Sequence, residues 1–171
     1  MNLVTDGLPA LALAVEPAEK DVMIRPPNPA SSNIFDRWMV TSILWVGLVM
    51  AALSLFAGNV LLQRGQAYWQ TMVFTTLTIS QIAFAMAARS DRSSIFRIGI
   101  TTNRSLLWAS LLTVGLQFVL IYVPFFNSVF KTSPLAAGDI LLSFGLSLLL
   151  ILITEIVKWL DRRWFRRNKP A

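Results

Sequence analysis

Residues 38–62 read WMVTSILWVGLVMAALSLFAGNVLL, an apolar run that contains no charged side chain. A helix needs about 20 such residues to cross the hydrocarbon core of a bilayer. Three more apolar runs follow at residues 69–88, 106–126 and 140–159, the third of them interrupted near its end by Pro124. The sequence therefore predicts an all-α integral membrane protein in which residues 38–160 form a bundle of four transmembrane helices.

Composition agrees with a membrane location and excludes several kinds of chemistry. Hydrophobic residues make up 55% of the chain and charged residues only 14%, whereas soluble domains carry about 25% charged residues. The chain has no cysteine and no histidine, which excludes disulfides, thiolate chemistry, the usual zinc sites and Ser-His-Asp or Cys-His catalysis. The net charge of +6 is attributed to basic residues that flank the apolar runs, where they contact anionic lipid headgroups and set the topology. The expected partner is therefore the bilayer, and no nucleic acid.

The lysines and arginines are distributed unevenly between the connections. Of the 15 basic residues, all but Arg64 and Lys131 lie before the first run, between the second and third, or at and after the end of the fourth. Because cytoplasmic connections carry the excess of Lys and Arg, both termini are predicted to be cytoplasmic. Residues 16–37, rich in proline and charge, are then a cytoplasmic loop and residues 161–171 a basic cytoplasmic tail. The plasma membrane is the expected location.

The first 15 residues, MNLVTDGLPALALAV, are apolar but too short to span a bilayer. They are predicted to form a half-helix stub, the end of a truncated transmembrane helix. Asp6 lies within this stretch, and an ionisable residue at membrane depth is costly enough to mark a functional site. The alternative is that Asp6 only caps a soluble helix, since Asp is an ordinary cap residue.

The residues around Asp6 favour the functional interpretation. Asn2 is followed by Thr5 and Asp6 at i+3 and i+4, so on a helix the three oxygen-bearing side chains share one face. A ligand set of oxygens alone suits a hard cation such as calcium. Gly7 and Pro9 would loosen the helix directly after Asp6 and free backbone carbonyls. The stub therefore predicts one divalent cation site centred on Asp6.

Several segments resemble P-type cation-transporting ATPases of the calcium-pump kind. NLVTDGLPALALAVEP, followed by DVMIRPP, resembles the end of the sixth transmembrane helix of those pumps and the loop after it. QTMVFTTLTISQ resembles the eighth helix, LQFVLIYVPFFNSVFK the end of the ninth, and TEIVKWLDR the end of the tenth. The resemblance covers nearly the whole chain and is weakest in residues 38–62, which correspond to the seventh helix.

The resemblance implies that the chain is the C-terminal membrane domain of an ATP-driven cation pump, with calcium as the first candidate. It makes Asn2, Thr5 and Asp6 cation ligands. The neutral Gln81 stands where a carboxylate completes a second ion site in calcium-pump relatives, so it is a weaker candidate ligand, and its alternative role is a hydrogen bond to a neighbouring helix. Residues 19–27 correspond to the loop that couples the ion sites to the catalytic domains, with Asp21 and Arg25 as the coupling residues.

The resemblance also implies that this chain does not carry out ATP hydrolysis alone. Such pumps form an aspartyl-phosphate within a DKTGT sequence, which is absent from the 171 residues. The chain is therefore expected not to hydrolyse ATP by itself. ATP and magnesium belong to a full-length parent, whose remaining domains, on the same or a separate chain, are the expected partners. Because Met1 falls inside an expected helix, the chain is interpreted as a fragment.

Two other functions remain open at this point. One is an autonomous small membrane regulator derived from a pump. The other is an unrelated four-span transporter, which would need a charged coupling residue within a span. Glu155 is the only acid inside the four runs, and its i+3 neighbour Lys158 favours a local ion pair instead. Gly47 and Ala51, at small-xxx-small spacing, and Gly145 predict close helix contacts.

Overall fold

The computed structural model describes residues 2–16, 37–89, 99 and 102–167, with side chains described for residues 7–16, 39–89, 99 and 102–160. These residues form six α-helices and no strand: α1 Asn2–Ala14, α2 Arg37–Gln63, α3 Trp69–Ala87, α5 Arg104–Tyr122, α6 Pro124–Phe130 and α7 Ala137–Arg167. The all-α prediction is confirmed. Asp21 and Arg25, the predicted coupling residues, lie outside the described residues.

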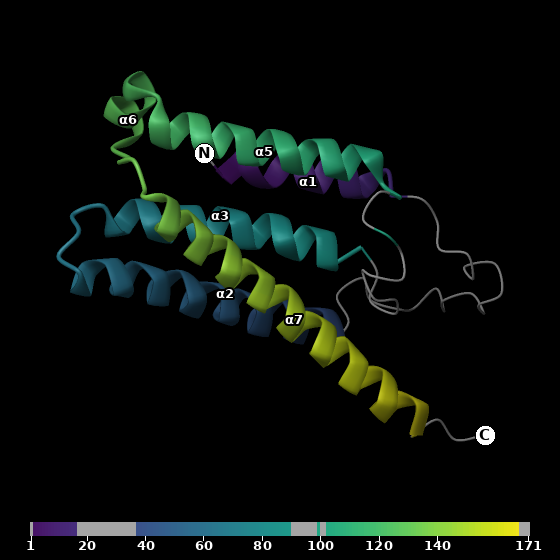
Figure 1. The fold of residues 1–171 in the computed structure, drawn as a ribbon. Helices are drawn as coiled ribbons and strands as arrows, with labels where there is room; N and C mark the ends of the chain where they lie inside the picture. The colour runs from purple at the N-terminus through teal and green to yellow at the C-terminus, as the bar shows by residue number, and fades with distance from the viewer. Residues whose placement is uncertain (1, 17–36, 90–98, 100–101, 168–171) are drawn as a thin grey trace.

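Helix α3 lies at the centre of the bundle. It packs against α2 and α7 on one side and against α1 and α5 on the other (Figure 1). The helices α1 and α3 end, and α5 begins, at one end of the bundle, which we call the Arg89 end. The opposite end, called the Arg64 end, carries the connection from α2 to α3 and the short helix α6 (Figure 1).

The interior around α3 is polar as well as apolar. Two hydroxyl pairs one helical turn apart join α3 to α7: Thr76 Oγ1 lies 2.9 Å from Ser143 Oγ, and Ser80 Oγ lies 3.1 Å from Ser147 Oγ. A cluster of buried apolar side chains that includes Leu61 and Met72 fills the Arg64 end. The hydroxyl groups of Thr76 and Ser80 therefore find partners on α7 inside the bundle.

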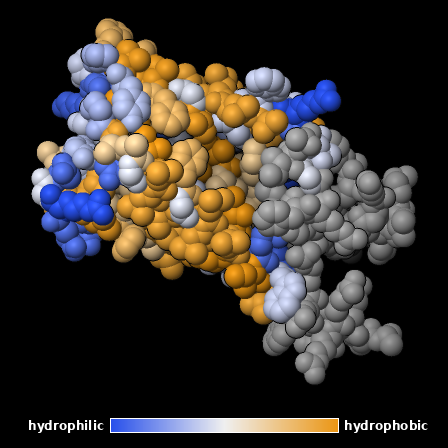
Figure 2. All heavy atoms as spheres, in the orientation of Figure 1, coloured by the Kyte–Doolittle hydropathy of each residue, from blue (hydrophilic) through white to orange (hydrophobic). Residues whose placement is uncertain are grey.

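Three helices within the described ranges are long and apolar enough to cross a membrane: Met39–Gln63 of α2, Arg104–Tyr122 of α5 and Ala137–Leu160 of α7. Helix α3 is as long as α5, with 19 residues each, but it is less apolar. The predicted count of four spans is therefore not confirmed. Figure 2 shows a broad apolar surface across the middle of the molecule, with hydrophilic residues at the Arg64 end.

The third apolar run is divided where proline requires it. Helix α5 ends at Tyr122, short of residue 126, and Val123 is extended with φ −85° and ψ 117°. A residue before proline is disfavoured in the helical region, so the chain turns there. Pro124 then begins α6, where its missing N–H is not needed.

The predicted close contacts at Gly47, Ala51 and Gly145 are wrong within this chain. All three residues are exposed, and a Cβ added at Gly47 or Gly145 would meet nothing within 4 Å. The close approach is at Gly58, where an added Cβ would overlap Val73 Cγ2 of α3. Spacing alone shows that small residues share a face, but the packing of α2 on α3 decides which face is covered.

Candidate cation site and its anchor

Helix α1 carries the three predicted ligand positions. Asn2, Thr5 and Asp6 all fall in the first half of a continuous helix that extends to Ala14. The spacing of these positions therefore places them on one face of α1, as predicted. Their side chains lie outside the described ones, so the convergence of their oxygens stays a prediction.

Pro9 lies inside α1 and is buried. The helix continues through Gly7 and Pro9, which were predicted to loosen it. Proline nevertheless has no N–H, so the carbonyl of Thr5, four residues earlier, has no donor within the helix. Helix α1 thus keeps its direction and still leaves one backbone oxygen available beside Asp6.

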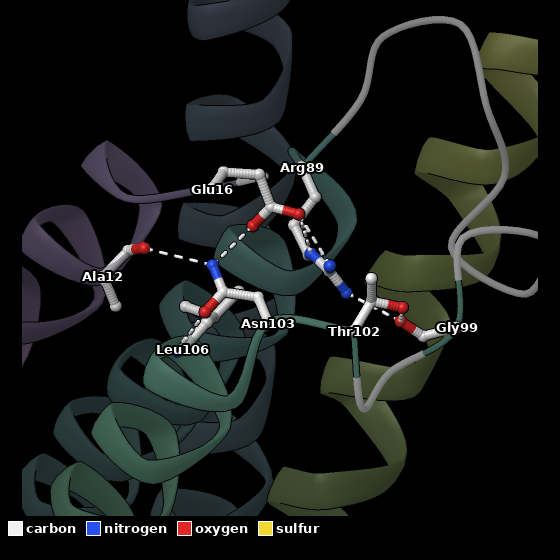
Figure 3. A network of polar contacts seen from close by, with 7 residues as sticks. All are labelled: Ala12, Glu16, Arg89, Gly99, Thr102, Asn103 and Leu106. Carbon is white, nitrogen blue, oxygen red and sulfur yellow. Dashed lines mark hydrogen bonds and ion pairs between the residues drawn. The ribbon is translucent and has the colours of Figure 1, made fainter. Parts of the chain in front are cut away.

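A buried polar cluster lies directly after α1, at the Arg89 end of the bundle (Figure 3). We call Glu16, Arg89 and Asn103 the junction. Arg89 donates from Nε and Nη2 to Glu16 Oε1, at 2.9 Å and 2.6 Å, and from Nη1 to the Gly99 carbonyl at 2.8 Å. The Arg89 side chain is only 2% exposed. Its charge is therefore compensated by Glu16 inside the protein.

Asn103 contributes to the junction with both ends of its amide. Its Oδ1 accepts from the Leu106 N–H at 2.8 Å and caps α5. Its Nδ2 donates to Glu16 Oε2 at 2.6 Å and to the Ala12 carbonyl, in the last turn of α1, at 3.1 Å. One buried side chain therefore connects the end of α1 to the beginning of α5.

The electrostatics of the junction keep Glu16 ionised. Partial burial raises the pKa of the Glu16 carboxyl, but hydrogen bonds from Arg89 and Asn103 and the Arg89 charge lower it by more. The pKa consequently lies below its ordinary value. The carboxylate and the guanidinium are both charged at neutral pH and stabilise each other.

Gln81 is half-buried on α3. With a rise of about 1.5 Å per residue, Gln81 lies about 12 Å along α3 from Arg89, and Asp6 about 15 Å along α1 from Glu16. The junction joins the two helices at Glu16 and Arg89, so Gln81 and Asp6 lie at similar depth. Thr78, one turn away, donates its proton to the Phe74 carbonyl of its own helix at 3.0 Å.

Sequence reasoning missed the junction and also Gln117. Gln117 is 3% exposed on α5 and donates from Nε2 to Thr75 Oγ1 of α3 at 3.1 Å. A lone amide in an apolar run was a detectable signal for Gln117. No comparable signal connects Glu16 with Arg89 and Asn103. Among the described residues, no three His, Cys, Asp or Glu residues form a metal-binding group.

The sequence of the chain matches a known family of transport proteins. The family model "Cation transporting ATPase, C-terminus" matches residues 1–160. The chain therefore belongs to this family, and the predicted resemblance to P-type cation ATPases is confirmed.

The similar proteins include calcium-transporting ATPases of animals and fungi. The chain is 32% identical to the human calcium-transporting ATPase type 2C member 1 over 95% of its length, and 31% identical to the Bos taurus protein of the same name over 100%. It is 30% identical to calcium-transporting ATPase 1 of Schizosaccharomyces pombe over 99%. The chain spans 18% of the length of each of these relatives.

Proposed function

We propose that the chain acts as the C-terminal membrane domain of an ATP-driven calcium pump and contributes part of its cation site. The observation that carries this proposal is Asp6 on the helix α1, within a chain that matches the cation-transporting ATPase family over residues 1–160. ATP and magnesium are assigned to domains of a longer parent or to a separate chain. The regulator and transporter alternatives receive no specific support.

In this proposal α1 supplies charge and oxygen together. The Asp6 carboxylate provides the negative charge, Asn2 and Thr5 provide neutral oxygens, and the Thr5 carbonyl is left available by Pro9. Gln81 can add a neutral oxygen from α3 at similar depth. Because Gln81 carries no charge, we propose a single divalent site, completed by ligands from helices outside this chain.

We propose that α3 crosses the membrane as a fourth helix, with its hydroxyl groups turned toward α5 and α7. The Arg89 end faces the cytoplasm, because Arg64 and Lys131 are the only basic residues assigned to the opposite side. Residues 16–37 then form the cytoplasmic loop in which Asp21 and Arg25 couple the site to the catalytic domains. Plasma membrane location stays a prediction that membrane fractionation checks.

The topology can be tested by cysteine labelling, since the chain has no cysteine of its own. Arg64→Cys is exposed enough for labelling, with 62% of the native side chain accessible. An impermeant thiol reagent should label this position only from the side opposite the cytoplasm. Labelling from the cytoplasmic side would contradict the proposed orientation.

The cation site can be tested in a chimera in which residues 1–171 replace the matching segment of the human relative. Asp6→Asn should abolish calcium-dependent phosphorylation from ATP and leave phosphorylation from inorganic phosphate without calcium intact. Glu155→Gln is the matched control, because Glu155 is an acid in a span that pairs with Lys158 at 3.8 Å. Normal calcium transport by Asp6→Asn would show that the assignment is wrong.

The chain by itself should neither hydrolyse ATP nor bind calcium tightly. Without ligands from other helices, an isolated carboxylate in apolar surroundings tends to become protonated. Isothermal titration of the purified chain in detergent should therefore detect no calcium binding at micromolar concentrations. A micromolar affinity would favour the autonomous-protein alternative.

A further inference from the structure

We propose that Glu16, Arg89 and Asn103 are positioning residues of the cation site: the junction holds the end of α1 against α3 and α5 and thereby sets the depth of Asp6. This inference rests on the proposed function. The hydrogen bonds described for these residues join them to one another and to Ala12, Gly99 and Leu106, so they act on the site through the helix that carries the ligand positions.

The first support is the way in which α1 ends. In a longer helix the N–H of residue 16 would bond to the Ala12 carbonyl, but here the Glu16 N–H donates to the Leu13 carbonyl at 3.0 Å. Residue 17 is a proline and has no N–H to add. The Ala12 carbonyl is therefore available to Asn103 Nδ2. Since the same amide caps α5, the two helix ends are held in one register.

The second support is the burial of charge. The side chain of Arg89 is 2% exposed and that of Glu16 is 19% exposed, and Asn103 is 3% exposed. The Glu16 carboxylate accepts from Arg89 on one oxygen and from Asn103 on the other. Moving α1 away from α3 and α5 would leave a buried arginine unpaired, which is strongly unfavourable. The junction therefore resists sliding and tilting of α1.

The third support is the distance over which such a displacement acts. Asp6 lies about 15 Å from Glu16 along α1. Because both residues move with this helix, a slip of α1 by one residue moves Asp6 by about 1.5 Å along the helix axis. The distances from a bound metal to its ligands normally lie within about 0.2 Å of their typical values, which is much less than this displacement. A small displacement of α1 at the junction is thus enough to misplace the carboxylate.

The test uses the chimera defined above and two variants that preserve local structure. Asn103→Ser retains a residue that caps α5 well but removes the bonds to Ala12 and Glu16. Glu16→Met with Arg89→Met replaces the ion pair by apolar side chains of similar length, a change that buried pairs often tolerate. Arg64→Ala is the matched control, because Arg64 pairs with Asp139 at 3.7 Å on the opposite end.

Both test variants should raise the calcium concentration for half-maximal phosphorylation from ATP by about tenfold, the size of effect that residues supporting metal ligands produce. Phosphorylation from inorganic phosphate without calcium should stay at the level of the unmodified chimera, which a general folding defect would lower. Arg64→Ala should match the unmodified chimera in both measurements.

Unchanged calcium dependence in Asn103→Ser would overturn the inference, and this variant decides alone if the double variant does not reach the membrane. Loss of both kinds of phosphorylation in Asn103→Ser would also overturn it, because that result indicates a structural role only. If Asp6→Asn blocks calcium-dependent phosphorylation while Asn103→Ser does not alter it, only the junction proposal fails. If Asp6→Asn is normal, the proposed function itself fails.

Discussion

Helices α2 and α3 lie side by side and use their side chains in opposite ways. Helix α2 exposes large apolar residues, with Leu44 at 69% and Leu48 at 72%, and buries a narrow stripe. The members of this stripe are Val46, Met50, Ser54, Ala57, Gly58 and Leu61. Helix α3 contacts four other helices and buries mostly threonine and serine among its polar residues. The helix that exposes more of its apolar surface within this chain is thus the more apolar of the two.

This difference shows what hydropathy measures in a membrane protein. Lipid is as apolar as a leucine side chain, so there is no hydrophobic gain in burying leucine between helices, and small polar residues are favoured there. Hydropathy therefore reports contact with lipid. The same contrast extends to the arginines that follow the two helices, because Arg64 is 62% exposed whereas Arg89 is 2% exposed.

The largest expected effect distinguishes these two arginines. Arg89→Ala should lower the free energy of unfolding by about 3–5 kcal/mol, because it leaves Glu16 partly buried without its counter-charge. Arg64→Ala should lower it by about 1 kcal/mol or less, as for exposed pairs. Dodecyl sulfate titration of the purified chain in detergent measures both. Equal losses would remove the distinction between the two helix ends.

A smaller effect is expected where α2 and α3 touch. Gly58→Ala should destabilise the bundle by about 1–3 kcal/mol, because the new methyl group overlaps Val73, a stiff β-branched side chain. Gly47→Ala is the matched control on the exposed face of the same helix and should cause no loss. If Gly47→Ala were the more damaging change, α2 would pack through its other face.

The hydroxyl pairs of α3 should contribute less still. Thr76→Val keeps the shape of the side chain and removes its bond to Ser143, at a cost of about 0.6–2 kcal/mol. The double variant with Ser143→Ala should cost less than the sum of the two single changes, since they remove the same bond. Ser128→Ala, at an exposed hydroxyl of α6, is the control. Additive effects would contradict a direct contact.

The smallest effect concerns pH. The pKa of Glu16 is lower in the folded chain than its ordinary value of 4.5, so the unfolded chain binds this proton more readily. The stabilisation is therefore fully present above about pH 4.5 and is lost as the pH falls through the folded pKa. Thermal unfolding at pH 6 and pH 4 measures the loss, which Glu16→Gln should reduce. An identical pH response in the variant would contradict a stabilised carboxylate.

Much of the helical framework could be predicted from apolar runs. Helices α2, α3, α5 and α7 begin and end within a few residues of the four runs, apart from the basic extension of α7 to Arg167. The local pair of Glu155 and Lys158 was predictable from its spacing and is confirmed at 3.8 Å. These features depend on neighbours in sequence. The predicted ligands Asn2, Thr5 and Asp6 also rest on local spacing and stay predictions.

The sequence by itself determined that this chain is an all-helical membrane protein with nearly all of its basic residues outside the apolar runs, and it carried the motifs of the cation-transporting ATPases. These properties follow from the lipid bilayer, which requires apolar helices whose backbone hydrogen bonds are made within each helix. Only the tertiary structure decided that Gly58 instead of Gly47 meets α3, and that Arg89 is buried against Glu16. Residues 73 positions apart meet through packing, and no local property of the chain specifies such a contact.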